Sequence, residues 1–291
     1  SSFLLLGAKA QCISALPSVI FIIVRIFSLK YKSLYKNKTA EFARIVLKGC
    51  LLPVALLTFY TLGIYAQINR TCGVDTKYNA VFYGVLKNSD NPKRDLQMLG
   101  LSSDMAVEAG KHAYLPKSEY EKYAPWSDIT MTEFNEKISN FSIVKFYLLN
   151  PKRLIQGMEY TASQSFQTAT FLGKYKKADV EEYTYLFNRF TLWSNIRGNC
   201  FPKKLWFIVS FYIAILAVTL FRYKRAQGSL IKLRIELIWA IAAIGILQFP
   251  MPFLGNGEAD TAKQLFLFNY SFDILIISLV AGGYILVQPA N

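Results

Sequence analysis

The sequence predicts an all-α integral membrane protein with five transmembrane helices and a mostly helical extracytoplasmic domain. Hydrophobic residues make up 53% of the 291 residues, more than in most globular proteins. They are gathered into blocks of about 20 residues, the length of a helix that crosses the hydrocarbon core of a bilayer. No stretch alternates apolar and polar residues for long enough to predict a sheet.

Five blocks have the length and composition of a span: about Phe3–Phe27, Ile45–Ile68, Leu205–Phe221, Ile235–Phe253 and Leu265–Val287. The apolar run Phe141–Ile155 is too short and too interrupted by charge to be a sixth. The chain therefore divides into two membrane helices, an extracytoplasmic helical domain and three further membrane helices, at residues 1–68, 69–204 and 205–291.

The net charge of +14 is concentrated beside the apolar blocks, at Arg25–Arg44 and Arg222–Arg234. Short basic loops between spans lie in the cytoplasm, whereas nucleic-acid binding would need stacking motifs that do not accompany this charge. This orientation places segment 69–204 and the turn Leu254–Gln264 outside, and the C-terminus in the cytoplasm. The first span would then begin outside without a signal peptide, so we expect the sequence to be the C-terminal portion of a larger protein.

Three segments of the outer domain are predicted to contain helices: Asn91–Leu99, Thr130–Leu149 and Asn150–Phe166. In the first, Asn91 is placed as the N-cap and Gly100 as the terminator. In the second, Thr130 and Glu133 have the spacing of a capping box. The third repeats the Asn-Pro start of the first.

The cysteines and the single histidine do not predict a metal or catalytic site. Cys12 and Cys50 lie in apolar blocks, where thiols behave as small hydrophobic groups. Cys72 and Cys200 bracket the outer domain and either pair there or remain free, because their spacing fits both alternatives. No Ser/His/Asp or Cys/His arrangement can be assembled around His112.

Lys9 lies near the outer end of the first predicted span. A cation at this depth either extends to the interface or binds an anion, such as a lipid-linked phosphate in the outer leaflet. Gln11 is two residues further on, about 200° around the helix, so it need not point the same way.

Glu258 and Asp260 occupy a turn that Gly255 and Gly257 allow to adopt positive φ angles. Two carboxylates there could bind a divalent cation such as Mg²⁺ or Mn²⁺, orient a sugar hydroxyl or act as a base. The alternative is a solvated turn whose acids favour the positive end of the next helix.

The fifth predicted span carries further polar groups. Lys263 precedes it, and Asn269 and Asp273 are four residues apart, so they share one helix face. Charge at the depth of Asp273 is costly against lipid, so this face should point inward, with Lys9 as a candidate partner. A purely structural contact between helices is the alternative.

The stretch GNGEADTAKQLFLFN (Gly255–Asn269) resembles a motif in a bacterial family of GT-C-type membrane glycosyltransferases of cell-wall or S-layer glycan biosynthesis. The family pattern is Gly-Asp-Gly-Glu-Ala-Asp, two residues, then Lys-His-Leu-Phe-Leu-Phe-Asn. Asn256 and Gln264 replace its Asp and His, which removes two titratable groups. AKAQC (Ala8–Cys12) and YNAVFYGVLKNSDNPKRDLQMLGL (Tyr78–Leu101) resemble two further family stretches, in the same order.

This resemblance implies the C-terminal part of a GT-C-like fold in a bacterial cell membrane. It implies a hexosyltransferase that moves a sugar from a polyprenyl-phosphate donor to a glycan or lipid acceptor outside, with the catalytic carboxylate upstream of Ser1. Positive charge at the leaving phosphate is electrostatic preorganisation, a role that suits Lys9 and Lys263. Glu258 and Asp260 would then contact sugar hydroxyls or a metal ion.

Two other classes of function stay open. A transporter or flippase for a lipid-linked or anionic substrate would use the charges of Lys9 and Asp273 along a translocation path. Against this class, the outer domain is large for a small carrier, and the spans show no inverted repeat. The third class is a membrane-anchored scaffold without catalytic activity.

Overall fold

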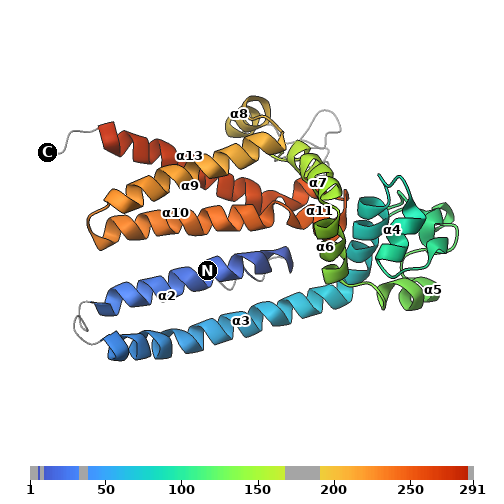
Figure 1. Cartoon of the computed structure of the whole chain (residues 1–291), viewed down its shortest axis with the longest axis horizontal. Coiled ribbons are helices and arrows are strands. Elements are labelled where there is room, and N and C mark those ends of the chain that lie inside the picture. The colour runs from blue at the N-terminus through green and yellow to red at the C-terminus, as the bar shows by residue number, and fades with distance from the viewer. Residues whose placement is uncertain (1–5, 7–9, 33–38, 168–190, 288–291) are drawn as a thin grey trace, which may run out of the picture. The chain divides into compact units, whose positions relative to one another are not determined.

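The computed structural model describes residue 6 and residues 10–32, 39–167 and 191–287, and it contains helices but no strand within these residues (Figure 1). The chain divides into two compact units. The first unit consists of Ser1–Thr71, Ser210–Phe249 and Tyr270–Asn291, and the second of Cys72–Val209 and Pro250–Asn269. We describe each unit by itself.

The first unit contains long apolar helices and one short 3₁₀ helix: η1 (Ala10–Ala15), α2 (Leu16–Lys32), most of α3 (Thr39–Tyr78), α9 (Leu205–Arg225), α10 (Ser229–Gln248) and α13 (Phe266–Val287). Among the described residues, three segments are long and apolar enough to cross a membrane: Cys12–Tyr31, Ala43–Arg70 and Leu205–Arg225. Large apolar side chains such as Leu47, Leu52 and Phe59 of α3 are exposed. Lipid, rather than water, suits such a surface.

Two predicted spans belong to helical segments that extend beyond their predicted ends. In the first, residues 10–15 form the 3₁₀ helix η1, α2 starts at Leu16, and the membrane-length segment ends at Tyr31. The second, predicted at Ile45–Ile68, agrees with the membrane-length segment Ala43–Arg70, and its helix α3 continues to Tyr78. Pro53 lies inside this helix without ending it, as is common for proline in membrane helices.

Polar contacts join α2, α9 and α10. The guanidinium of Arg25 donates to both carboxylate oxygens of Glu236, and the hydroxyl of Tyr223 donates to the same carboxylate at 2.9 Å. One helical turn away, the indole nitrogen of Trp239 donates to the hydroxyl of Thr219 at 2.8 Å. These charged and polar side chains therefore meet partners on neighbouring helices, which lowers the cost of placing them in a membrane.

The second unit is built from short helices that follow the end of α3: η2 (Asn79–Val85), α4 (Pro92–Met98), η3 (Ser103–Glu108), η4 (Lys117–Glu119), α5 (Asp128–Thr130), η5 (Met131–Asn135), α6 (Asn140–Leu149), α7 (Pro151–Ser163), α8 (Leu192–Cys200), α11 (Met251–Asn256) and α12 (Thr261–Gln264). The turns η2 and η5 are π-helical.

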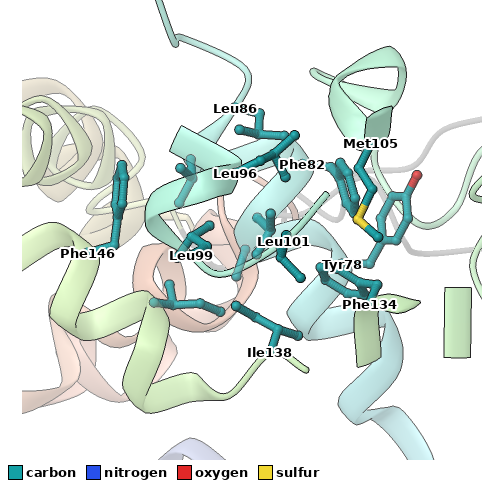
Figure 2. Close-up of a cluster of buried hydrophobic side chains, with 14 of the residues drawn as sticks. Tyr78, Phe82, Leu86, Leu96, Leu99, Leu101, Met105, Phe134, Ile138 and Phe146 are labelled. Atoms are coloured by element: carbon teal, nitrogen blue, oxygen red, sulfur yellow. The ribbon is translucent and has the colours of Figure 1, made fainter. Parts of the chain in front are cut away.

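Aromatic and aliphatic side chains form the core of this unit (Figure 2). The rings of Tyr78 and Phe82 lie 4.3 Å apart between centroids, and Phe134 packs against both. Leu96 of α4 and Met105 of η3 close the cluster, and neither is exposed to solvent. The core therefore holds the end of α3 and η2 in place, and η2 leads directly to the candidate site.

The first of the three predicted outer helices has the predicted caps. The side chain of Asn91 accepts a hydrogen bond from Arg94 N at 3.1 Å, and Pro92 is the first helical residue. Gly100 follows with a φ of 76°, a left-handed conformation that favours glycine at a helix end. The spacing of these residues in the sequence was sufficient to predict the helix.

Of the starts predicted for the other two helices, the capping box at Thr130 is wrong, whereas Asn150 and Pro151 are the N-cap residue and the first residue of α7, as predicted. Thr130 makes no capping hydrogen bond, and the caps are Ser127 for α5 and Ser139 for α6. The side chain of Asn150 does not cap α7 but donates to Phe146 O, in the last turn of α6. The side chain of an Asn between two helices can cap the C-terminus of the first helix or the N-terminus of the second, and the sequence pattern does not distinguish these roles.

Candidate functional site

The turn between α11 and α12 is held by close backbone packing. Gly257 has a φ of 58°, and a Cβ at this position would collide with Asn79 O of η2. A Cβ on Gly84 would lie 2.9 Å from Gly257 Cα. Glycine is therefore required at both positions. Gly255, for which we had predicted the same freedom, lies within α11.

Two buried amides connect this turn to η2. Asn79 accepts a hydrogen bond from Ala113 N at 2.6 Å and donates to Asn256 Oδ1 at 2.9 Å. Asn256 in turn donates to Ala259 O at 2.8 Å. Both side chains are buried, so these bonds replace the water contacts that the amides lose.

Of the two acids of this turn, Glu258 faces the interior, since 8% of its side chain is exposed, whereas Asp260 is exposed. Its carboxylate accepts hydrogen bonds from Lys87 Nζ and, at 2.9 Å, from Asn88 Nδ2. Its backbone carbonyl accepts one from the hydroxyl of Tyr160 at 2.9 Å. The carboxylate is therefore oriented by the adjacent residues Lys87 and Asn88, and the backbone of Glu258 is held by Tyr160.

Lys87 is held in its charged form. Its ammonium lies 4.2 Å from the centre of the Tyr83 ring. Burial alone would lower the pKa of Lys87, but hydrogen bonds to Glu258 and Tyr83 outweigh this effect and raise the pKa above its usual value. The ammonium therefore remains a donor to Glu258 at neutral pH.

A pocket of about 190 Å³ lies beside Glu258. It is lined by rings, amides, a cation and an acid: Gly84, Asn88, Tyr147, Arg153, Gln156, Gly157, Tyr160, Phe253 and Glu258. Gly157 allows Phe253 to form one wall, because a Cβ there would overlap the ring. The volume is that of about six water molecules, which suits one small polar ligand with an apolar face.

Tyr147 contributes a buried polar atom to this pocket. Its side chain is 1% exposed, and its hydroxyl has no hydrogen-bond partner among the described residues. Burial raises the pKa of Tyr147 above its usual value, so the hydroxyl keeps its proton. An unpaired buried hydroxyl costs free energy that a bound ligand oxygen would recover.

Arg153 is positioned by residues outside the pocket. One terminal nitrogen donates to Asp95 Oδ2 at 3.1 Å, and the other donates to Val85 O. Asp95 also accepts a hydrogen bond from Ser89 at 2.6 Å. These partners fix the guanidinium plane, which has five donors in total.

The structure brings only part of the predicted site together. Glu258 lines the pocket, whereas Asp260, with a φ of 53°, and Lys263 are exposed on the same turn. Lys9 lies outside the described residues, and the side chain of Gln11, in η1, is not described either.

The two polar groups of α13 differ in their surroundings. Asn269 is buried, and its side chain accepts from Phe166 N at 3.0 Å and donates to Gln167 O. Asn269 therefore binds the backbone that follows α7. Asp273 is half-buried and belongs to the first unit.

Several pocket residues were not identified from the sequence. Asn88, and Lys87 that binds Glu258, fall within the stretch that resembles the glycosyltransferase family. This resemblance was the one signal in the sequence that could have identified them. Tyr147, Arg153 and Tyr160 come from α6 and α7 and carry no such signal. In the part of the chain that the structure describes, no three His, Cys, Asp or Glu residues form a metal-binding group. Cys200 is an exposed free thiol, and the side chain of Cys72 is not described.

Comparison with known protein families gives a match over nearly the whole chain. The model of a family described as the YfdI N-terminal transmembrane domain matches residues 1–288, nearly the whole chain. No curated protein and no solved structure matches the chain.

Proposed function

The chain belongs to the YfdI N-terminal transmembrane domain family, and from this premise we propose that it takes part in the transfer of a sugar from a polyprenyl-phosphate donor to a cell-envelope glycan or lipid. The observation that carries the proposal is the pocket with its buried Tyr147 hydroxyl and oriented Glu258 carboxylate. Rings, amides and an acid around a small volume are the groups that bind a monosaccharide.

Each pocket group has a role in this proposal. The rings of Tyr160 and Phe253 would contact the apolar face of the sugar, and the Tyr147 hydroxyl would donate to a ring or hydroxyl oxygen. The Glu258 carboxylate, which forms an ion pair with Lys87, would accept from a sugar hydroxyl. Arg153 keeps donors for an anionic oxygen.

The reaction requires one bond exchange. The oxygen of an acceptor hydroxyl attacks the anomeric carbon of the sugar, and its proton passes to a base. The bond from that carbon to the phosphate oxygen breaks, and the polyprenyl phosphate leaves with the electron pair. The exposed Lys263 would stabilise that phosphate, while Asp260 would contact hydroxyls or a divalent cation bound together with the phosphate.

We also propose that α10 and α13 are the fourth and fifth spans. Lys232, Arg234 and Glu236 in the first half of α10 exceed the charge of an ordinary span. Glu236 is nevertheless paired with Arg25 of α2, which reduces the cost of placing it in the membrane. In this arrangement the second unit is extracytoplasmic and the C-terminus is cytoplasmic.

The protein in lipid nanodiscs, supplied with labelled polyprenyl-phosphate hexoses and lipid-linked oligosaccharide acceptors, tests the proposal. We expect Glu258→Gln and Tyr147→Phe each to lower transfer at least about tenfold, equivalent to about 1.4 kcal/mol of transition-state stabilisation. Glu119→Gln, at an exposed acid of the same unit, should leave transfer unchanged.

Size-exclusion profiles and melting temperatures would show that the variants remain folded. Wild-type transfer by both pocket variants would refute the assignment of this pocket. Movement of labelled lipid between leaflets, without a new glycosidic bond, would support the transporter alternative instead.

A further inference from the structure

The helix α6 is apolar on two opposite faces. Ile143, Phe146 and Tyr147 point into the core of the second unit and are buried. Phe141 and Leu148 lie on another face and are 76% and 68% exposed. A helix that is apolar all round is normally covered on every side, so an apolar medium or partner is expected on the outer face of α6.

The exposed residues follow helical spacing. Phe141, Lys145, Leu148 and Leu149 stand at positions i, i+4, i+7 and i+8, which form one stripe along a helix. Lys145 is the one charged residue of α6, and it is exposed within this stripe. A lysine beside large apolar side chains is typical of a helix at a membrane interface, where the ammonium reaches the head groups.

The next helix continues this surface to the end of a membrane span. In α7, Lys152, Ile155 and Glu159 stand at positions i, i+3 and i+7, and all three are exposed. The carboxylate of Glu159 accepts a hydrogen bond from Leu205 N at 3.2 Å. Leu205 is the first residue of α9, a helix long and apolar enough to cross a membrane.

The start of α9 has the composition of a membrane–water interface. Lys204 and Trp206, on either side of Leu205, are both exposed. Trp is enriched where a span meets the head groups, and Lys at this level pairs with lipid phosphates. Because Glu159 binds directly to Leu205 N, a head-group level at the start of α9 would place the outer face of α7 at the same level.

From these observations we propose that α6 and α7 form a lipid-binding surface that rests on the bilayer beside the start of α9. Phe141, Leu148, Leu149 and Ile155 enter the boundary between head groups and acyl chains. Lys145 and Lys152 bind the phosphates of anionic lipids. This inference depends on the membrane location of the family and not on the proposed sugar transfer.

The surface also has a consequence for the candidate site. Tyr147 and Gly157, on the inner faces of these same helices, line the pocket beside Glu258. Contact of the outer faces with lipid would therefore hold the pocket close to the membrane surface.

Spin labels at Leu148→Cys and Ile155→Cys, in protein whose native cysteines are replaced by serine, test the proposal in nanodiscs. We expect the ratio of accessibility to oxygen over accessibility to a water-soluble nickel chelate to be several-fold higher at these sites than at Val107→Cys. Val107 is an exposed apolar residue of η3 and serves as the matched control.

A ratio at Leu148 and Ile155 equal to that at Val107 would overturn the proposal. Labels shielded from both reagents would also overturn it, because a protein segment or a second copy would then cover the surface. Nanodiscs of phosphatidylcholine with and without phosphatidylglycerol test the lysines. The labels should lie deeper with the anionic lipid, and this difference should disappear in Lys145→Gln/Lys152→Gln. Equal depth in both lipids with the lysines intact would refute phosphate binding.

Discussion

At the scale of single residues, Asn256 shows why an amide fits at a position where the glycosyltransferase motif of the sequence analysis has an aspartate. Asn79 and Asn256 form a chain of hydrogen bonds that begins at Ala113 N and ends at Ala259 O. Because backbone groups stand at both ends, the orientation of both amides is fixed. An aspartate at position 256 could accept from Asn79 but, when ionised, could not donate to Ala259. From the sequence alone, we could say only that Asn256 replaces a titratable aspartate of the motif.

Asn256→Asp should therefore destabilise the protein by about 1–3 kcal/mol, since it leaves a buried carbonyl without its donor and buries a charge. The loss should shrink as the pH falls, because a protonated acid can again donate to Ala259 O. Thermal unfolding in detergent at several pH values measures the effect. Asn91→Asp is the matched control, because the exposed Asn91 side chain accepts from Arg94 N and aspartate caps equally well. Equal melting temperatures for the two variants would contradict this account.

Single residues also show where prediction of the site ended. The sequence pointed to Glu258 as a candidate site residue because it lies in a short motif with Asp260 and Lys263. Its partners Lys87 and Asn88 are more than 160 residues away in the sequence. A contact at such separation follows from the packing of η2 against the turn at Gly257, and no local pattern encodes that packing.

At the scale of the elements, the sequence predicted the existence of helices better than their ends. Apolar blocks and the Asn-Pro signals placed α4, α6, α7 and α9, because periodicity and proline act locally. Competing local partners decided the remaining ends. Ser139 caps α6 and Asn150 closes it, although Thr130 and Glu133 have the spacing of a capping box.

The contact of α2 with α10 includes one ion pair in addition to apolar packing. Arg25 binds both oxygens of Glu236, so Glu236→Gln removes the charge that compensates Arg25 within the first unit. We expect a loss of about 1.5–3 kcal/mol, the usual contribution of hydrogen bonds to charged groups. Arg25→Lys should cost less, since it keeps the charge but loses the two-point geometry.

Thermal unfolding in nanodiscs measures both effects, and Lys224→Gln, at an exposed cation in the last turn of α9, serves as the control. The single variants Arg25→Gln and Glu236→Gln and the double variant that combines them measure the coupling of the pair. The double variant should lose less free energy of unfolding than the sum of the losses of these two single variants, because it leaves no lone charge. Additive losses would mean that the pair contributes no coupling energy.

At the scale of the whole molecule, the division of the chain follows its hydropathy only in part. The long apolar blocks form the first unit, as their composition suggests. Segment Pro250–Asn269 belongs instead with the second unit, although it joins two apolar helices. The reason is its packing: Phe253 fits against Gly157, and Gly257 against Gly84. The hydropathy of a segment indicates whether lipid or water surrounds it, but it does not indicate which other segment it packs against.

The orientation of the whole chain is predicted by its charges. The basic segments Arg25–Arg44 and Arg222–Arg234 connect α2 to α3 and α9 to α10, and short basic loops between membrane helices remain in the cytoplasm. The second unit would then be outside. We expect a membrane-impermeant maleimide, added to intact cells, to label Ser118→Cys and to spare Ser229→Cys until the cells are opened. Both serines are exposed, and the native cysteines would be replaced by serine to remove background labelling. Labelling of Ser229→Cys alone in intact cells would invert the orientation and would exclude an extracytoplasmic sugar transfer, because the Glu258 pocket lies in the same unit as Ser118.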